Sequence, residues 1–319
     1  MRYATLTLSP CLDQTIFLQH SFQPGFLNRF EHSSISAGGK GVNVSRMLHM
    51  LGAQSDMFGF CGGTTGKLLC DLLAREGLSN RFTQTQAATR VCVKLTDADG
   101  ICSELNGRAG PIHQEEFAAL LRTLQTLLSG REENEEPITV FLCGSVPYGI
   151  ADGVYGDLIR YFDASRARHV RFVLDADAQP LSLGLAQRPY LMKPNRHELS
   201  NMLGFTVDSA DTALYAAKRI YEEYQTAVAV TLGAEGSVYV GEQGSYLVNA
   251  PSVAPRALVG AGDVYLATLV FLLDQAIPIE TALRHAAAMA GAKVENTEHF
   301  LPSVTAAEEL ARRVTVRKV

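Results

Sequence analysis

Short apolar runs rich in β-branched residues alternate along this chain with longer segments whose apolar residues recur at helical spacing. The strand-like runs are "YATLTLS", "TVFLCGS", "VRFVLDAD", "YLMKPN" and "AVAVTLG". The helical segments include "EEFAALLRTLQTLL", "GVYGDLIRYFDA", "TALYAAKRIYEEY" and "ETALRHAAAMAGAKV". This alternation predicts βαβ units, and hence an α/β fold with a mainly parallel sheet covered by helices on both faces.

Two stretches lack a crossover helix and interrupt this alternation of strands and helices. One runs from about 12 to 36, and the other, from about 89 to 107, contains "TRVCVKLTDADGICSELN", which alternates on both sides of a "DADG" turn and predicts a hairpin. We expect these strands to form a small separate sheet. Since ligands of α/β proteins bind at the carboxyl edge of the parallel strands, such a sheet is placed to act as a lid. No linker divides the chain, so we predict one domain over 1–319 with this lid.

The composition narrows the classes of protein that remain. The chain has 319 residues, of which 47% are hydrophobic and 19% charged, and its formal net charge is −5, which argues against a nucleic-acid partner. The longest apolar run, "VYLATLVFLL", is shorter than the roughly 20 residues that cross a bilayer, and the N-terminal segment lacks a signal peptide's apolar core. We therefore expect no membrane partner and a cytoplasmic location. The six scattered cysteines and the absence of H-E-x-x-H spacing predict neither a disulfide framework nor a structural zinc site.

The stretch "LVGAGDVYLA", from Leu258 to Ala267, places an aspartate just after two glycines and before an apolar helical run. One interpretation is structural, because Asp is a good residue at a helix start. The other is catalytic. The backbone N–H groups of Ala261, Gly262 and Asp263 can converge on an anion, and Asp263 beside them can accept a hydroxyl proton, which is the combination that phosphoryl transfer requires.

Three further segments carry polar residues or glycines at the ends of predicted strands. In "KPNRHEL", Asn195 and Glu198 have the spacing of a capping box, but with Lys193 they are also suited to hold hydrated Mg²⁺ or phosphate. The segment "SAGGKGVNVSRMLHMLG" joins a glycine-rich turn to a helix and is not a Walker A loop. In "VTLGAEGSVYV", turn chemistry alone accounts for the glycines. Each segment alone leaves both interpretations open.

Together and in this order, the four segments resemble the PfkB, or ribokinase-like, family of carbohydrate kinases, over essentially the whole chain. Within it the chain is most similar to the branch of 1-phosphofructokinase and tagatose-6-phosphate kinase, through "TLTLSPCLD", "LNR", "AGGKGVNVSRML", "TRVCVKL", "LCGSVPYGI" and "KPNRHEL". The resemblance implies a three-layer α/β/α fold with a small β-sheet lid. It also implies an ATP- and Mg²⁺-dependent kinase of sugar phosphates.

The resemblance implies a role for each matching residue. Asp263 corresponds to the general base, and the anion hole is formed by Gly260, Ala261 and Gly262. On the sugar side, Asp13 matches the residue that holds hydroxyls, Arg90 matches the basic lid residue near the substrate's phosphate, and the sugar-site turn supplies Gly39, Lys40 and Asn43.

Of the remaining matches, Ser145 belongs to the substrate-binding residues and the others lie on the nucleotide side. Ser145 and Lys193 correspond to the surroundings of the phosphates, and Asn195 with Glu198 corresponds to the motif that organises Mg²⁺ through water. The nucleotide-side turn matches at Thr231, Gly233 and Gly236.

The chain also departs from the family pattern. Ser9-Pro10 precedes Asp13 where the family often has Asn-Pro, Ala257-Leu258 precede the GAGD motif, and Thr268-Leu269 replace a Gly-Phe pair. These changes leave open a second hypothesis, a sugar-phosphate or nucleotide binding protein without turnover.

Two basic residues indicate the class of substrate, and the edges of the small sheet indicate a second copy of the chain as a partner. Lys40 and Arg90 fall in segments that should face the sugar, where a neutral sugar would leave two cations without an anion, so we expect a phosphorylated ketohexose. Fructose 1-phosphate is the first choice, and tagatose 6-phosphate or another sugar of this family the alternative. A small sheet leaves edges that are best paired, so we also expect a homodimer through the lid.

Overall fold

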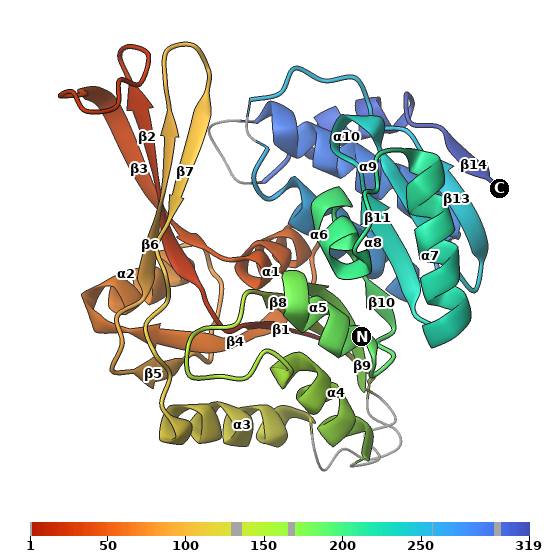
Figure 1. Ribbon diagram of the computed structural model, residues 1–319, viewed down its shortest axis with the longest axis horizontal. Helices are drawn as coiled ribbons and strands as arrows, with labels where there is room; N and C mark the ends of the chain where they lie inside the picture. Colours follow the sequence, from red (N-terminus) through yellow and green to blue (C-terminus); the bar gives the residue numbers. More distant parts are fainter. Residues whose placement is uncertain (1, 129–135, 165–169, 257, 297–300) are drawn as a thin grey trace.

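The computed structural model describes residues 2–128, 136–164, 170–256, 258–296 and 301–319 (Figure 1). Within these ranges, a ten-stranded sheet has the order β14-β13-β12-β11-β10-β9-β8-β1-β4-β5, and a smaller sheet has the order β3-β2-β6-β7. The ten strands are β1 (Arg2–Thr7), β4 (Ser55–Gly62), β5 (Thr83–Thr85), β8 (Ile138–Gly144), β9 (Val170–Ala176), β10 (Leu191–Met192), β11 (Ala227–Thr231), β12 (Ser237–Gly241), β13 (Gly244–Val248) and β14 (Val316–Lys318).

The large sheet is parallel from β5 to β11, and β12, β13 and β14 extend it as an antiparallel edge. The described helices are α1 (Lys40–Met50), α2 (Gly63–Arg75), α3 (Gln114–Leu128), α4 (Val154–Ala164), α5 (Ala178–Leu185), α6 (Arg196–Leu203), α7 (Ala210–Tyr224), α8 (Ala261–Asp274), α9 (Ile279–Glu295) and α10 (Val304–Ala311), with a short 3₁₀ turn, η1 (Gly233–Glu235). The predicted fold class is confirmed, and the helical segments read from the sequence lie within one or two residues of α3, α4, α7 and α9.

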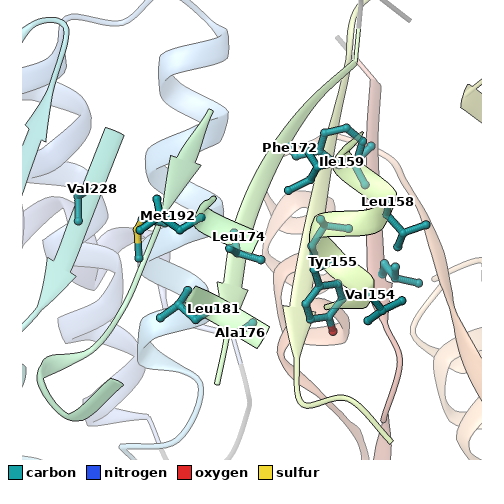
Figure 2. Close-up of a cluster of buried hydrophobic side chains, with 14 of the residues drawn as sticks. Val154, Tyr155, Leu158, Ile159, Phe172, Leu174, Ala176, Leu181, Met192 and Val228 are labelled. Carbon is teal, nitrogen blue, oxygen red and sulfur yellow. The ribbon is translucent and has the colours of Figure 1, made fainter. Parts of the chain in front are cut away.

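Alternate residues of the central strands point into two separate cores. On β8, Val140 and Leu142 pack with helices α3 to α7, whereas Phe141 and Cys143 pack with α1, α8, α9 and α10. Figure 2 shows the first of these cores, where Ile159 of α4 lies beside Phe172 of β9 and Leu174 of β9 lies on the side of Leu181 of α5. Burial on both faces explains why these strands are continuously apolar.

The strand predicted over "YLMKPN" is shorter than expected. Only Leu191 and Met192 pair with both neighbours, and the chain then leaves the ladder at Lys193 and Pro194. Proline has no N–H to donate, so the ladder cannot continue through it. This early exit places the polar residues that follow at the edge of the sheet.

The small sheet consists of β2 (Cys11–Leu18), β3 (Phe30–Gly38), β6 (Arg90–Thr96) and β7 (Cys102–Asn106), and it stands away from the large sheet in Figure 1. The predicted hairpin is the β6–β7 pair. The central β2–β6 pair is parallel, which the sequence does not reveal. None of the described helices combines the length and the apolar character needed to cross a membrane.

Candidate active site

The polar residues singled out from the sequence gather at one edge of the large sheet. Ser145 follows β8, Lys193 follows β10 and Thr231 ends β11. The carboxyl ends of parallel strands meet at the same edge, and this is where α/β proteins bind ligands. The lid strands rise beside this edge (Figure 1).

Asp263 lies in the first turn of α8 and is only 7% exposed. Gly260 is the N-cap, no described side chain caps the helix, and Asp263 Oδ2 instead accepts a 2.7 Å hydrogen bond from Asn43 Nδ2. The capping interpretation of Asp263 is therefore wrong. Burial, reinforced by the charge of Asp175, raises the pKa of this carboxyl to about 7, against the opposing effects of Asn43 and two lysines. A carboxyl with such a pKa is well matched to proton transfer near neutral pH.

Asn43 is itself held by a chain of contacts that the sequence does not reveal. Arg46 Nη1 donates to Asn43 Oδ1 at 3.2 Å, and Arg46 Nη2 donates to Glu76 Oε1 at 2.7 Å. Because the Asn43 oxygen is taken by Arg46, its NH₂ group is directed at Asp263. Arg46 and Glu76 thus orient the asparagine that binds the candidate base. The nearest sequence signal is that Arg46 interrupts the apolar face of α1.

The start of α8 has the features of an anion site. Gly260 has φ of 86°, a conformation that favours glycine, and the N–H of Ala261 makes only a long 3.4 Å contact with the carbonyl of Leu258. A Cβ on Gly262 would lie 3.4 Å from Lys193 Nζ, which places that ammonium against the helix start. The helix dipole and Lys193 therefore act on the same spot.

The two lysines of the site share one buried carboxylate that was not among the predicted residues. Asp175 is fully buried, with Lys40 Nζ at 3.2 Å from Oδ1 and Lys193 Nζ at 3.1 Å from Oδ2. Burial opposes the charged state of all three groups. Their mutual attraction outweighs it, so the pKa of Asp175 is lowered and those of both lysines are raised. Asp175 lies near the end of β9, and Asp177 follows the strand as the N-cap of α5; the sequence signal is "DAD".

Lys40 does not face the sugar as a cation without an anion. Its ammonium contacts Asp175, Asp177 Oδ1 at 2.7 Å and Glu198 Oε1 at 2.9 Å. The premise that Lys40 needs a substrate phosphate is therefore wrong, because three carboxylates surround it. The chain supplied these anions from β9 and α6, far from Lys40 in sequence.

Asn195 and Glu198 form the capping box that their spacing predicts. Glu198 N donates to Asn195 Oδ1 at 2.9 Å, and Asn195 N donates to Glu198 Oε2 at 2.7 Å. The other oxygen of Glu198 binds Lys40. The structural interpretation is thus confirmed, and it does not exclude the functional one, because the box holds Glu198 beside Asp175 and Asp177.

Two predicted sugar-side residues lie on the lid. Asp13 on β2 accepts a 2.7 Å hydrogen bond from Lys94 of β6. The Arg90 guanidinium donates to the backbone carbonyls of Ser9 and Gly107, and it forms no ion pair with a carboxylate of the described residues. A pocket lined by Arg90, Ser9 and Thr89 adjoins this guanidinium and does not reach Asp263. Arg90 is therefore a fixed cation whose charge is not neutralised by an acid of the described chain.

The predicted nucleotide-side turn adjoins the Asn195 segment. Thr231 N donates to Pro194 O at 3.0 Å, and Gly233 and Gly236 have φ of 63° and 106°. A Cβ on Gly236 would collide with the carbonyl of Val248, so glycine is required there. Gly39 also has a positive φ, 128°, at the start of α1.

The residues that depart from the family pattern have different surroundings. Ala257 lies outside the described residues. Leu258 is largely exposed, whereas Thr268 and Leu269 are buried within α8. These two buried positions contribute to packing.

Asp263 has a pKa near 7 and lies beside a helix N-terminus and a lysine, at the edge of the sheet where the parallel strands end. This arrangement is typical of enzymes that transfer phosphoryl groups. The profile of the pfkB family carbohydrate kinase matches residues 6–304. The chain belongs to this family, and it is an ATP-dependent sugar kinase.

Curated relatives and solved structures agree with this assignment. The chain is 32% identical to 1-phosphofructokinase of Bacillus subtilis over 280 residues, 88% of each protein. It is 29% identical to 1-phosphofructokinase of Escherichia coli K12 over 296 residues, 93% of this chain and 92% of the relative. The structure of phosphofructokinase-2 from Escherichia coli in complex with substrates and products superposes with a TM-score of 0.87 at 26% identity, covering 98% of this chain and 99% of that one.

Proposed function

We propose that this kinase transfers the γ-phosphoryl group of ATP to fructose 1-phosphate, which gives fructose 1,6-bisphosphate and ADP. The choice of a phosphorylated sugar rests on one observation. Backbone carbonyls hold the Arg90 guanidinium in place on the lid, and it has no ion-pair partner among the described residues. A sugar phosphate supplies the missing anion through charge-assisted hydrogen bonds. The choice of fructose 1-phosphate over tagatose 6-phosphate rests on the names of the curated relatives.

In the proposed reaction, a sugar hydroxyl forms a bond to the γ-phosphorus while the bond to the β-phosphate oxygen breaks. Asp263 takes the hydroxyl proton, and Asn43 holds its carboxylate in position through the 2.7 Å hydrogen bond. The N–H groups at the start of α8 and the Lys193 ammonium stabilise the charge on the moving group. Asp13 holds the sugar hydroxyls, and closure of the lid excludes water, which would otherwise accept the phosphoryl group.

The site also fits Mg²⁺. Three carboxylates, Asp175, Asp177 and Glu198, pair with only two lysines there. Asp263 is a fourth acid near the same lysines, so the cluster has a surplus of negative charge and its oxygen donors suit a hard cation. We assign Glu198 and Asn195 to holding the ion through water, with Asp175 and Asp177 beside them. When bound, the ion neutralises charge on the ATP phosphates. Thr231, Gly233 and Gly236 would face the nucleotide, and Ser145 would face the substrate.

The pH dependence of kcat/KM is expected to show an ascending limb near pH 7, because Asp263 must lose its proton to act as a base. The phosphate of the sugar also titrates, near pH 6. The Asn43→Ala variant distinguishes titration of Asp263 from titration of the sugar phosphate, because the hydrogen bond from Asn43 lowers the pKa of Asp263. In that variant the limb should move to higher pH. A limb that stays in place would assign it to the substrate.

We also propose that two chains dimerise through the lid. Strand alternation puts Ile35, Val91 and Leu105 on the lid face opposite Asp13, and their exposed fractions are 47%, 36% and 60%. On the same face, Ile16 of β2 pairs with Leu95 of β6, and Val93 of β6 pairs with Leu105 of β7. All four strands therefore contribute apolar side chains to this face, with the polar Gln14 between Ile35 and Val93. Such a face on a small isolated sheet is best covered by a second copy.

The dimer is tested by sedimentation of the Leu105→Glu variant at tens of micromolar, a range that reveals any dimer tighter than roughly −7 kcal/mol. We expect a dimer for the unmodified chain and a monomer for the variant. Tyr215→Glu, at an exposed position on α7, is the matched control and should leave the dimer intact. A monomeric unmodified chain would contradict the proposal.

We propose a cytoplasmic location for this activity. All six cysteines are free thiols, and Cys61 and Cys70 remain unbonded with their sulfurs 3.8 Å apart. Free thiols at this spacing persist in a reducing compartment. ATP and sugar phosphates are also metabolites of that compartment.

A further inference from the structure

Three metal-ligating side chains lie together on the face of the lid that carries Asp13. Cys11 and Asp13 are two residues apart on β2, so they share a face, and the parallel register pairs Asp13 with Cys92 on β6. One ligand atom from each of these residues lies within 4.8 Å of the other two. The sequence gives no sign of this cluster, because the third ligand comes from a strand far along the chain.

The spacing of these atoms is close to that of a zinc site. Cys11 Sγ donates a 3.4 Å hydrogen bond to Asp13 Oδ1. With Zn–S and Zn–O bonds of about 2.3 and 2.1 Å at a tetrahedral angle, the sulfur and oxygen of a shared zinc would be about 3.6 Å apart. Two sulfurs on that zinc would be about 3.8 Å apart. The ligands therefore need shifts of only about 1 Å or less.

Gly38 leaves room for the three ligands, and Lys94 orients Asp13. Gly38 of β3 lies opposite Cys11, and a Cβ there would be 2.6 Å from Asp13 Cγ and 2.8 Å from Cys11 Sγ. Any other residue would thus push the ligands apart. Lys94 holds Asp13 Oδ2, which leaves Oδ1 directed at the thiols. Both cysteines are buried and the Asp13 side chain is 15% exposed, so Asp13 is the most accessible of the three ligands.

We propose that Cys11, Asp13 and Cys92 bind a thiophilic divalent cation such as Zn²⁺, and that the bound ion competes with the sugar for Asp13. Binding releases the two thiol protons to solvent and breaks no covalent bond other than these S–H bonds. Two thiolates and a carboxylate bring three negative charges, which outweigh the nearby cations Lys94 and Arg90. Sulfur ligands select zinc over Mg²⁺, so the Mg²⁺ of the kinase reaction does not fill this site. The competition rests on the proposed role of Asp13 in sugar binding.

The metal site is tested directly with Co²⁺, which gives near-ultraviolet thiolate charge-transfer absorption when sulfur binds it. With a phosphine reductant in the buffer to keep the thiols reduced, we expect one equivalent of Co²⁺ per chain to produce this band. Added Zn²⁺ should abolish it. The band should be lost in Cys11→Ser and Cys92→Ser and kept in Cys102→Ser, a control at an exposed thiol of β7. Circular dichroism checks that each variant is folded, and Cys11→Ala and Cys92→Ala replace any serine variant that is not. No band in the unmodified chain, or an unchanged band in the folded Cys11 and Cys92 variants, would overturn the site and leave the kinase proposal untouched.

Competition is tested by kinetics at saturating Mg²⁺ and ATP. At a free Zn²⁺ concentration ten times its Kd, a competitive ion raises the apparent KM for fructose 1-phosphate about 11-fold with kcat unchanged. The KM in Cys102→Ser should rise equally, and the KM of the folded Cys92 variant should not respond. Metal binding with the thiolate band but an unchanged KM would overturn the competition, and with it the role of Asp13.

Discussion

Replacing Asp263 by Asn is expected to lower kcat by about 10²–10⁴-fold, the range of a positioned general base. The variant keeps the shape of the side chain and can still accept the hydrogen bond from Asn43, but it cannot take a proton. Both substrates should bind as before, so the loss belongs in kcat rather than in KM. Steady-state kinetics, with ATP and sugar-phosphate binding measured separately, check this expectation. A variant that retained a third of the rate would show that Asp263 is not the base.

The same variant should be more stable than the parent at neutral and alkaline pH. The folded-state pKa of Asp263 is raised above its unfolded value, so the folded chain is penalised for ionising it. The penalty is absent well below pH 4, where the carboxyl is protonated in both states. It grows between the unfolded pKa near 4 and the folded pKa near 7, and it is constant above that. Thermal melting should therefore give a higher Tm for Asp263→Asn at pH 8 and little difference at pH 4. A higher Tm together with lost turnover excludes misfolding as the cause.

Replacing Arg90 by Ala is expected to raise the KM for the phosphorylated sugar by about 10- to 150-fold, equivalent to roughly 1.5–3 kcal/mol for a hydrogen bond to a charged group. The guanidinium is already fixed by the carbonyls of Ser9 and Gly107, so little ordering opposes its contact with a phosphate. The KM for ATP should stay unchanged, because Arg90 lies on the lid.

Arg81→Ala is the matched control for Arg90. Arg81 is exposed and pairs with Asp56 at 2.7 Å, away from the lid, so its loss should leave both KM values unchanged. If Arg90→Ala left the KM for fructose 1-phosphate unchanged, the substrate's phosphate would have to bind elsewhere.

Local signals predict the parts of the site that are built within one segment. The capping box of Asn195 and Glu198 and the left-handed glycines at 233 and 236 follow from short-range chemistry, and the structure has them. The alternation of apolar runs likewise predicts the parallel core, because each strand must be buried on both faces.

Partners that come from distant strands could not be predicted in this way. The sequence does not indicate the partners of Lys40, because Asp175, Asp177 and Glu198 reach it only when the chain folds. Arg46 reaches Asp263 only through Asn43, and no pattern within α1 indicates that link. Of the two cations expected to face the sugar, only Arg90 therefore lacks a carboxylate partner among the described residues.

The preferred substrate is identified by ADP release, measured with a coupled assay for fructose 1-phosphate, tagatose 6-phosphate and free fructose under identical conditions. We predict that kcat/KM for fructose 1-phosphate exceeds that for free fructose by at least the roughly 10-fold that loss of one charged hydrogen bond implies. Tagatose 6-phosphate should rank between them. Equal kcat/KM for fructose and fructose 1-phosphate would contradict the account and indicate a kinase of unphosphorylated sugars, and sugar binding without any ADP release would indicate a protein that binds the sugar without turnover.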